Sequence, residues 1–425
     1  MRHHRGLAGI ALGTMALAAP FATAQEQPYS GVTLNVASMN DQFSGPLVVL
    51  APSFEAETGI AVKVDILSYP ELLTKITADF IGETGGYDVV TMDIVWAGQF
   101  AEAGHTVLLN DWIARDAEEI GVDDIYPVLM QALGNYEGAQ VAFPFAGYAN
   151  VLAYRPDLYE AAGIAPPQTM EELVAAARAL TDREANRYGW VANGQRGPAV
   201  AQDWMQYNAQ MGGSILDAEG MPALNSPENV ASLTVYKTLF DETAPPGAVD
   251  YDWGGREESF RQGLVANMQT WSVGAAGYDN PDLSKVVGNN ALMLAPPGAG
   301  MEPRYGIGGW GLAINADIDE TRQAAAWEYI KWVTSPEVQK QMAELGGGGY
   351  IRMSTLADPD LNALYPFLPV IHESFLNGDG EYRPRIPEYP EIQDILGTAV
   401  NAVLAGDVDP QEALDAAQEQ AMELF

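Results

Sequence analysis

The stretch GIGGWGLAIN at residues 306–315 contains the spacing G-x-G-x-x-G, at Gly306, Gly308 and Gly311. Such glycines cradle the pyrophosphate of a dinucleotide when a strand precedes them and a helix begins at the last one. Here Gly311 runs into the short apolar segment LAIN, which indicates a strand. We therefore expect no helix N-terminus for phosphate, no nucleotide and no other cofactor.

The remaining reactive residues form no familiar catalytic or metal motif. The sequence lacks G-x-S-x-G, H-E-x-x-H and P-loop patterns, and beyond the first few residues it has only His105 and His372, which occur singly. The acidic segments DAEG and DVDPQE do not match a calcium loop. We expect no metal site. With 57 acidic residues, however, chance pairs are common, so an exported glycosidase with two catalytic carboxylates stays an alternative.

Residues 1–24 have the pattern of a secretory signal peptide. Arg2 and Arg5 precede an apolar run from Leu7 to Ala19, and Ala22-Thr23-Ala24 offers a small-residue cleavage site after Ala24. The apolar run is too short for a permanent membrane anchor. Because the chain has no cysteine, it has neither a disulfide nor an acceptor for an N-terminal lipid. We expect export to a bacterial periplasm without a lipid anchor.

The composition restricts the partners and the domain count. The net charge is −36, and it becomes −38 without Arg2 and Arg5. Such a charge repels nucleic acid and anionic membranes, so we expect neither as a partner. The roughly 400 residues after the leader exceed one hydrophobic core, which predicts two domains.

Strand and helix patterns alternate in the first part of the chain. Residues 32–36 and 62–66 alternate with period two, and 87–93 form a buried strand-like run. Residues 45–59 and 70–80 have helical patterns between them. This β-α-β-α-β order predicts an α/β fold with a mainly parallel sheet and helices on both faces.

Further along, TMEE at Thr169 and the Ser-Pro-Glu segments at Ser226 and Ser335 predict helix starts. Proline- and glycine-rich breaks occur near residues 145, 296 and 346. Three breaks suggest three crossovers between two discontinuous lobes, which form a cleft that closes by hinge rotation.

Several ordered segments match a known family. FEAETGIAVKV, GGYDVVTMD, FRQGLVANMQTW, GGWGLAIN and AAAWEYIKWVTSPEVQKQMAELGG resemble solute-binding proteins of carbohydrate ABC importers, the maltose-binding-protein class. RMSTLADPDL and IPEYPEIQDILGTAVNAVLAG are most similar to its polyol and monosaccharide branch.

The resemblance implies the two-lobed periplasmic binding protein fold. Residues 28–145 and 297–345 would form one lobe, and residues 146–296 and 346–425 the other. It also implies a monomer without enzymatic activity, which binds a sugar or polyol between the lobes and delivers it to the permease subunits of an ABC importer.

A sugar receptor needs Asp, Asn, Gln and Arg for the hydroxyls and aromatic rings for the C–H faces, in loops beyond strand carboxyl ends. Asn40, Asp41 and Gln42 follow the first strand, and Asp93 and Trp96 follow the third. Each has an alternative role, because Asn40, Asp41 and Asp93 are good helix caps and a tryptophan such as Trp96 often packs in a core.

The other candidates come from the crossovers and the second lobe. Tyr148 lies near the first crossover, and Gln195 and Arg196 lie in a glycine-bounded loop. The family pattern favours Trp271 as a stacking platform, with core packing as the alternative. A structural tyrosine and a surface arginine are the alternatives for Tyr148 and Arg196.

Gly309 and Trp310 are predicted to line the cleft, because glycines let a backbone approach a flat ligand closely. A glycine-rich hinge is the alternative. Arg352 matches a family arginine position, although the four preceding glycine residues depart from the family pattern. Arg196 and Arg352 together raise the possibility of an anionic sugar.

Two other functions stay open. An exported carbohydrate-active enzyme would convert its sugar, and the same fold could bind a polyamine or another cation in an acidic, aromatic cleft.

Overall fold

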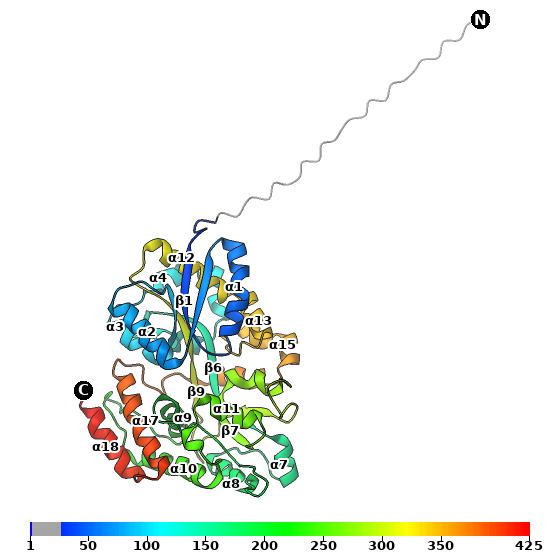
Figure 1. Cartoon of the computed structure of the whole chain (residues 1–425), viewed down its shortest axis with the longest axis vertical. Helices are drawn as coiled ribbons and strands as arrows, with labels where there is room; N and C mark the ends of the chain where they lie inside the picture. The colour runs from blue at the N-terminus through cyan, green and yellow to red at the C-terminus, as the bar shows by residue number, and fades with distance from the viewer. Residues whose placement is uncertain (2–26) are drawn as a thin grey trace.

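The described strands of this protein form one curled sheet of eight strands and a separate two-stranded ribbon. The structure is a computed structural model that describes Met1 and residues 27–425 (Figure 1). Apart from Met1, the expected signal peptide lies outside the described residues. The sheet order is β2-β1-β3-β9-β6-β7, with β8 beside β6 and β10 beside β9. The strands are β1 Thr33–Met39, β2 Ala61–Leu67, β3 Val89–Asp93, β6 Phe143–Tyr154, β7 Asn267–Trp271, β8 Ala291–Leu294, β9 Tyr305–Ile314 and β10 Gly378–Asp379, with β4 Asn135–Tyr136 and β5 Ala139–Gln140 in the ribbon.

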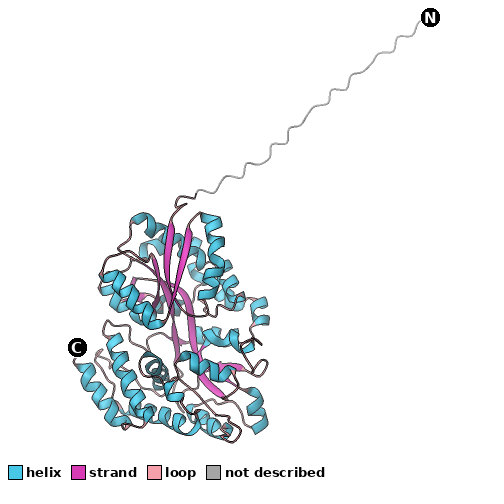
Figure 2. Ribbon diagram, viewed as in Figure 1, coloured by secondary structure: helices cyan, strands magenta, loops and turns pink. Residues whose placement is uncertain are grey.

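Helices cover the sheet on both sides (Figure 2). The α-helices of the first half are α1 Ser44–Thr58, α2 Tyr69–Ile81, α3 Ala97–Glu102, α4 Asn110–Arg115, α5 Ala117–Ile120, α6 Pro127–Ala132, α7 Pro156–Ala162, α8 Met170–Leu180 and α9 Pro198–Gln210. Those that follow are α10 Pro227–Thr243, α11 Trp253–Arg261, α12 Glu320–Val333, α13 Pro336–Glu344, α14 Met353–Ala357, α15 Pro359–Leu364, α16 Leu368–Leu376, α17 Tyr389–Ala405 and α18 Pro410–Met422. Short 3₁₀ helices are η1 Ile94–Trp96, η2 Val122–Asp124, η3 Ala248–Asp250 and η4 Ser272–Asp279.

The β-α-β-α-β start of the chain is confirmed. β1 pairs with β2 and β3 in parallel, and α1 and α2 connect these strands. α1 ends at Gly59, whose φ of 73° suits a glycine at a helix C-terminus. The predicted stripe of Leu72, Ile76 and Phe80 on α2 is buried. The predicted helix starts at Ser226 and Ser335 are also confirmed, because the side chain of each serine accepts a hydrogen bond from a backbone N–H of the first helical turn.

Two long strands connect the upper and lower halves of the molecule (Figure 1). The first part of β6 pairs with β9, and its second part, from Asn150 to Tyr154, pairs with β7 and β8. β9 pairs with β3 near its end and with β10 at its start. A third segment passes the same place, because Tyr350 pairs with Gly147 of β6.

The structure differs from the sequence expectation in two details. The two strand-like pieces near residue 145 form one continuous 12-residue strand, β6. The pairings of β6 with β7, β8 and β9, and of β3 with β9, are antiparallel. Parallel pairing occurs only among β1, β2 and β3 and in the short β9–β10 pair of the described sheet. Antiparallel pairing follows because β6 and β9 run in opposite directions between the halves.

The G-x-G-x-x-G segment lies within β9, so the prediction of a strand instead of a nucleotide loop is confirmed. Its glycines allow close packing. A Cβ at Gly308 would lie 2.6 Å from Cη2 of Trp271, and a Cβ at Gly309 would lie 2.2 Å from the carbonyl oxygen of Ala146 on β6. Gly309 also has a φ of 140°. β9 therefore has no space for a side chain at Gly308 or at Gly309.

Replacement of Gly309 should weaken the fold at the contact between β6 and β9. We expect Gly309→Ala to lower the free energy of unfolding by about 2 kcal/mol or more, through backbone strain and overpacking. Gly45→Ala is the control, because Gly45 lies in α1 with no atom within 4 Å of the added Cβ. Urea unfolding of both variants measures the difference. Equal stability of the two variants would contradict the steric explanation.

Candidate functional site

Three parallel strands end at one edge of the sheet, and polar or aromatic side chains follow each of them. Asn40 and Asp41 follow β1, Tyr69 follows β2, and Asp93 is the last residue of β3. Because the carboxyl ends of parallel strands meet at one edge, these side chains lie together. They line one wall of a cavity of ≈ 710 Å³.

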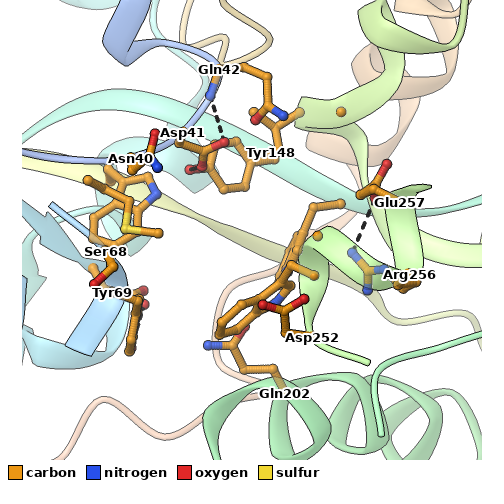
Figure 3. A pocket seen from close by; sticks show the side chains of 18 of the residues that line it. Asn40, Asp41, Gln42, Ser68, Tyr69, Tyr148, Gln202, Asp252, Arg256 and Glu257 are labelled. Atoms are coloured by element: carbon orange, nitrogen blue, oxygen red, sulfur yellow. Dashed lines mark hydrogen bonds and ion pairs between the residues drawn. The ribbon is translucent and has the colours of Figure 1, made fainter. Parts of the chain in front are cut away.

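The opposite wall comes from the other half of the chain. Trp253, Arg256 and Glu257 belong to α11, and Trp271 is the last residue of β7. Arg383 reaches the cavity from the segment between β10 and α17. Figure 3 shows side chains of both walls pointing into the space between them.

Asp41 is the acceptor held by the loop after β1. Its Oδ1 accepts the Gln42 backbone N–H at 2.8 Å, and its Oδ2 accepts the Tyr148 hydroxyl at 2.9 Å. Burial raises the pKa of Asp41 to about 6, although both hydrogen bonds lower it, and the charge of Glu257 adds to the rise. At neutral pH the carboxylate is mainly charged, and further donors would stabilise it.

Asp93 is a second acceptor, deeper in the cavity wall. It is 5% exposed, and its Oδ2 accepts the Tyr69 hydroxyl at 3.0 Å. Burial raises the pKa of Asp93, while the positive charge of Arg383 and the Tyr69 hydrogen bond lower it. The site thus contains two carboxylates that accept hydrogen bonds from tyrosines and can accept more.

Two of the three tryptophans that line the cavity, Trp271 and Trp310, are mostly buried, whereas Trp253 is half-buried. Trp310 of β9 lies opposite Asp93 in the β3–β9 register, with its ring centroid 6.1 Å from Tyr69 and 5.6 Å from Trp96. Trp310 is 5% exposed and Trp271 is 8% exposed. These indoles therefore offer the cavity only a small part of their surface.

A buried ionic network holds the α11 wall in place. Nη1 of Arg256 donates to both Asp203 oxygens at 2.8 and 2.9 Å, and its Nη2 donates to Thr270 at 2.9 Å and to Glu257 at 3.3 Å. Glu257 also accepts the Tyr278 hydroxyl at 2.7 Å. The network joins α9, α11, β7 and η4. The charge of Arg256 is thus satisfied within the protein.

The groups that line the cavity are suited to hydrogen bonding and apolar contact. Within residues 27–425, no group of three or more His, Cys, Asp or Glu side chains is arranged to hold a metal ion. Carboxylates supply acceptors, Arg383 supplies donors, and aromatic rings supply apolar contact.

Nine of the predicted site residues line the cavity, and three do not. The nine are Asn40, Asp41, Gln42, Asp93, Tyr148, Gln195, Trp271, Gly309 and Trp310. Trp96, Arg196 and Arg352 lie elsewhere.

The structure gives these three residues other contacts. Trp96 is 1% exposed and packs behind Trp310, in the core. Arg196 is exposed, and its Nε donates to the Thr398 hydroxyl at 3.1 Å. Arg352 is fully buried, where it donates to the carbonyl oxygens of Thr334 and Ile120 and pairs with Asp124. The guanidinium of Arg352 donates to backbone carbonyl groups of two distant segments, and Arg352 does not line the cavity.

Sequence reasoning missed several residues of the cavity. Tyr69 follows a parallel strand in the same way as Asn40, so the strand rule could have found it. Trp253 and Glu257 lie on a helix start with an ordinary cap at Asp252. Arg383 lies in an irregular segment, and no local pattern marks it.

Comparisons with known proteins now place the chain in a family. Residues 37–340 match the family described as bacterial extracellular solute-binding protein. The chain belongs to this family. The resemblance inferred from the sequence is confirmed.

Individual relatives support the same assignment. An ABC transporter solute-binding protein from Agrobacterium radiobacter K84, solved in complex with ribitol, is 62% identical, with a TM-score of 0.91 over 94% of this chain and 100% of that one. One from Agrobacterium vitis S4, with bound D-mannitol, is 27% identical, with a TM-score of 0.84 over 92% and 98%. The mannitol-binding protein of Pseudomonas aeruginosa is 26% identical over 408 residues, or 91% of this chain and 92% of its own length.

These matches confirm the two-lobed fold and the assignment to ABC transporter solute-binding proteins. The relatives are named as binding proteins, and none of these names describes an enzyme.

The buried network predicts a large stability difference between two similar substitutions. We expect Asp203→Asn to lower the free energy of unfolding by about 3 kcal/mol, because it removes the main counter-charge of a buried arginine. Asp241→Asn should change it by less than about 1 kcal/mol, because the Asp241–Lys237 pair is exposed. Chemical denaturation at pH 7 tests both. Similar losses for the two variants would show that the network does not hold the wall.

Proposed function

We propose that this chain is an exported periplasmic receptor that captures a polyol between its lobes and delivers it unaltered to an ABC permease. The observation that carries the proposal is the convergence of Asp41 and Asp93 from one wall with Arg383 from the other. A hydroxyl group both donates and accepts, so a chain of hydroxyls suits such a mixture of acceptors and donors.

The burial of Trp271 and Trp310 favours an acyclic polyol over a sugar ring stacked on either indole, although the half-buried Trp253 also lines the cavity. A pyranose needs a broad indole face, whereas Trp271 and Trp310 are more than nine-tenths buried. The 62% identical relative was solved with ribitol, so we place a five-carbon polyol first among the candidates.

We also propose that the two lobes close over the solute. The predicted lobes, residues 28–145 with 297–345 and residues 146–296 with 346–425, would rotate about β6, β9 and the segment near Tyr350. α14 and α15 pack against α13, so we move these two helices from the predicted second lobe to the first lobe. The rings of Tyr69 on α2 and Trp253 on α11, 5.9 Å apart, then form a contact between the two lobes. Such an aromatic contact would help hold the closed state.

A polyamine is the less favourable cargo. A cation in the cavity would lie near the guanidinium of Arg383, and the repulsion would be strong at low exposure to water. A carbohydrate-active enzyme is likewise disfavoured, because the relatives above are binding proteins.

Isothermal titration calorimetry with purified protein tests the proposed cargo. Ribitol, D-mannitol, maltose and putrescine form the panel, and chromatography of each recovered compound tests for turnover. We expect the polyols to bind without conversion and putrescine not to bind. Binding of putrescine alone, or conversion of any compound, would reject the proposal.

The raised pKa of Asp41 predicts pH-dependent binding. A hydroxyl that donates to Asp41 favours the charged form, so binding lowers its pKa from about 6 towards the ordinary value. Protons therefore compete with the polyol, and affinity should fall about tenfold between pH 7.5 and pH 5. Asp41→Asn should bind more weakly at pH 7.5 and lose this dependence. A pH-independent wild-type affinity would show that Asp41 does not contact the polyol.

A further inference from the structure

Two opposite charges lie buried in the cavity without forming an ion pair. Asp93 is 5% exposed and Arg383 is 2% exposed, and both line the same cavity. Buried ions of opposite sign normally pair, because each charge loses its hydration. Among the residues that the structure describes, however, no nitrogen of Arg383 lies within 4.0 Å of a carboxylate oxygen.

The surroundings of Arg383 are mainly aromatic. Its guanidinium carbon lies 5.3 Å from the ring centroid of Trp271 and 5.4 Å from that of Tyr382, and Tyr389 is a further neighbour. Its buried Nε has no hydrogen-bond partner within the described part of the chain. Cation–π contacts satisfy the charge only in part. The Nε is closed to solvent, so only the two terminal nitrogens of the guanidinium can donate to a solute in the cavity.

Asp93 is in a complementary position. Tyr69 donates to one of its oxygens, and the electrostatic influence of Arg383 reaches the carboxylate without direct contact. A group between the two residues must therefore donate to a carboxylate and accept from a guanidinium. A hydroxyl does both, while a carboxylate lacks the donor and an ammonium lacks the acceptor.

We propose that Asp93 and Arg383 are a specificity-determining pair that is bridged by adjacent hydroxyls of a neutral polyol. The proposal rests on the proposed function and deepens it. The planar fork of the guanidinium matches two neighbouring oxygens, so a vicinal diol is the unit recognised. The pair selects against both signs of charge, since Asp93 and Asp41 repel a carboxylate and Arg383 repels an ammonium. This assignment argues against the anionic sugar considered from the sequence.

The first test uses ligands. Calorimetry should compare ribitol with 2-deoxyribitol, D-ribonate and 1-amino-1-deoxyribitol on the wild-type protein. Loss or replacement of a bridging hydroxyl leaves buried polar groups unpaired. We therefore expect the affinity of each analogue to be lower than that of ribitol by about 100-fold or more. Tight binding of D-ribonate or of the amine would overturn the inference while leaving a hydroxylated cargo intact. Failure of ribitol and D-mannitol to bind would reject the proposed function itself.

The second test uses variants of the pair. Asp93→Asn and Arg383→Met should each weaken ribitol binding about 100-fold and should reduce the preference for ribitol over 2-deoxyribitol. Arg178→Met is the matched control, because Arg178 pairs with Glu242 at the surface and does not line the cavity. It should keep both the affinity and the preference.

Thermal unfolding without ligand separates recognition from a structural role. A buried arginine without an acidic partner opposes folding, so Arg383→Met should unfold at the same temperature as the wild type or higher. A clear fall in Tm with an unchanged preference for ribitol would show a structural role and overturn the inference.

Discussion

The pairing of β6 with β9 determines where the cavity lies. These strands continue from one half of the molecule into the other, so each wall is connected to the same two-stranded element. The strands approach closely where Gly309 faces Ala146, and Gly308 leaves room for the indole of Trp271 beside the strand. A side chain at either glycine would separate the strands or displace the tryptophan. The two crossovers that β6 and β9 form therefore depend on close packing of their backbones at Gly309 and Ala146.

Each charge near the cavity is satisfied in a different way, and this division explains the proposed selectivity. Arg256 is paired with Asp203 and Glu257, which fixes the wall and leaves little attraction for an anion. Asp41 and Asp93 accept tyrosine hydroxyls and retain capacity for more donors. Arg383 has aromatic neighbours in place of an acid. Such a mixture of separated charges favours a neutral solute with many hydroxyls, since each hydroxyl interacts with both signs.

The proposed lobe closure and the proposed solute binding depend on the same electrostatics. Closing the cavity removes water from Asp41 and Asp93, and their charged forms then need donors from the solute. A solute without hydroxyls cannot supply them, so closure over such a molecule is unfavourable. The contact between Tyr69 and Trp253 adds apolar stabilisation to the closed state only after this cost is met.

Local signals allowed several helices and strands to be predicted from the sequence. The strands at residues 32–36 and 62–66, the stripe on α2 and the serine caps depend on neighbouring residues, and the structure contains all of them. The alternation was wrong at Ile66, which is 41% exposed. The rule that ligand groups follow strand carboxyl ends led to Asn40, Asp41 and Asp93, and they line the cavity. A glycine motif followed by an apolar run was enough to predict a strand.

The partners of the charged residues could not be predicted in this way. Arg352 and Arg383 are both arginines in irregular segments, yet one donates to backbone carbonyls and the other lines the cavity. The difference depends on residues more than 200 positions away, such as Ile120 for Arg352. The sequence thus determined the elements and the kinds of group available at the strand ends. The tertiary structure decided which charges are satisfied inside the protein and which face a solute, because that depends on contacts between distant segments.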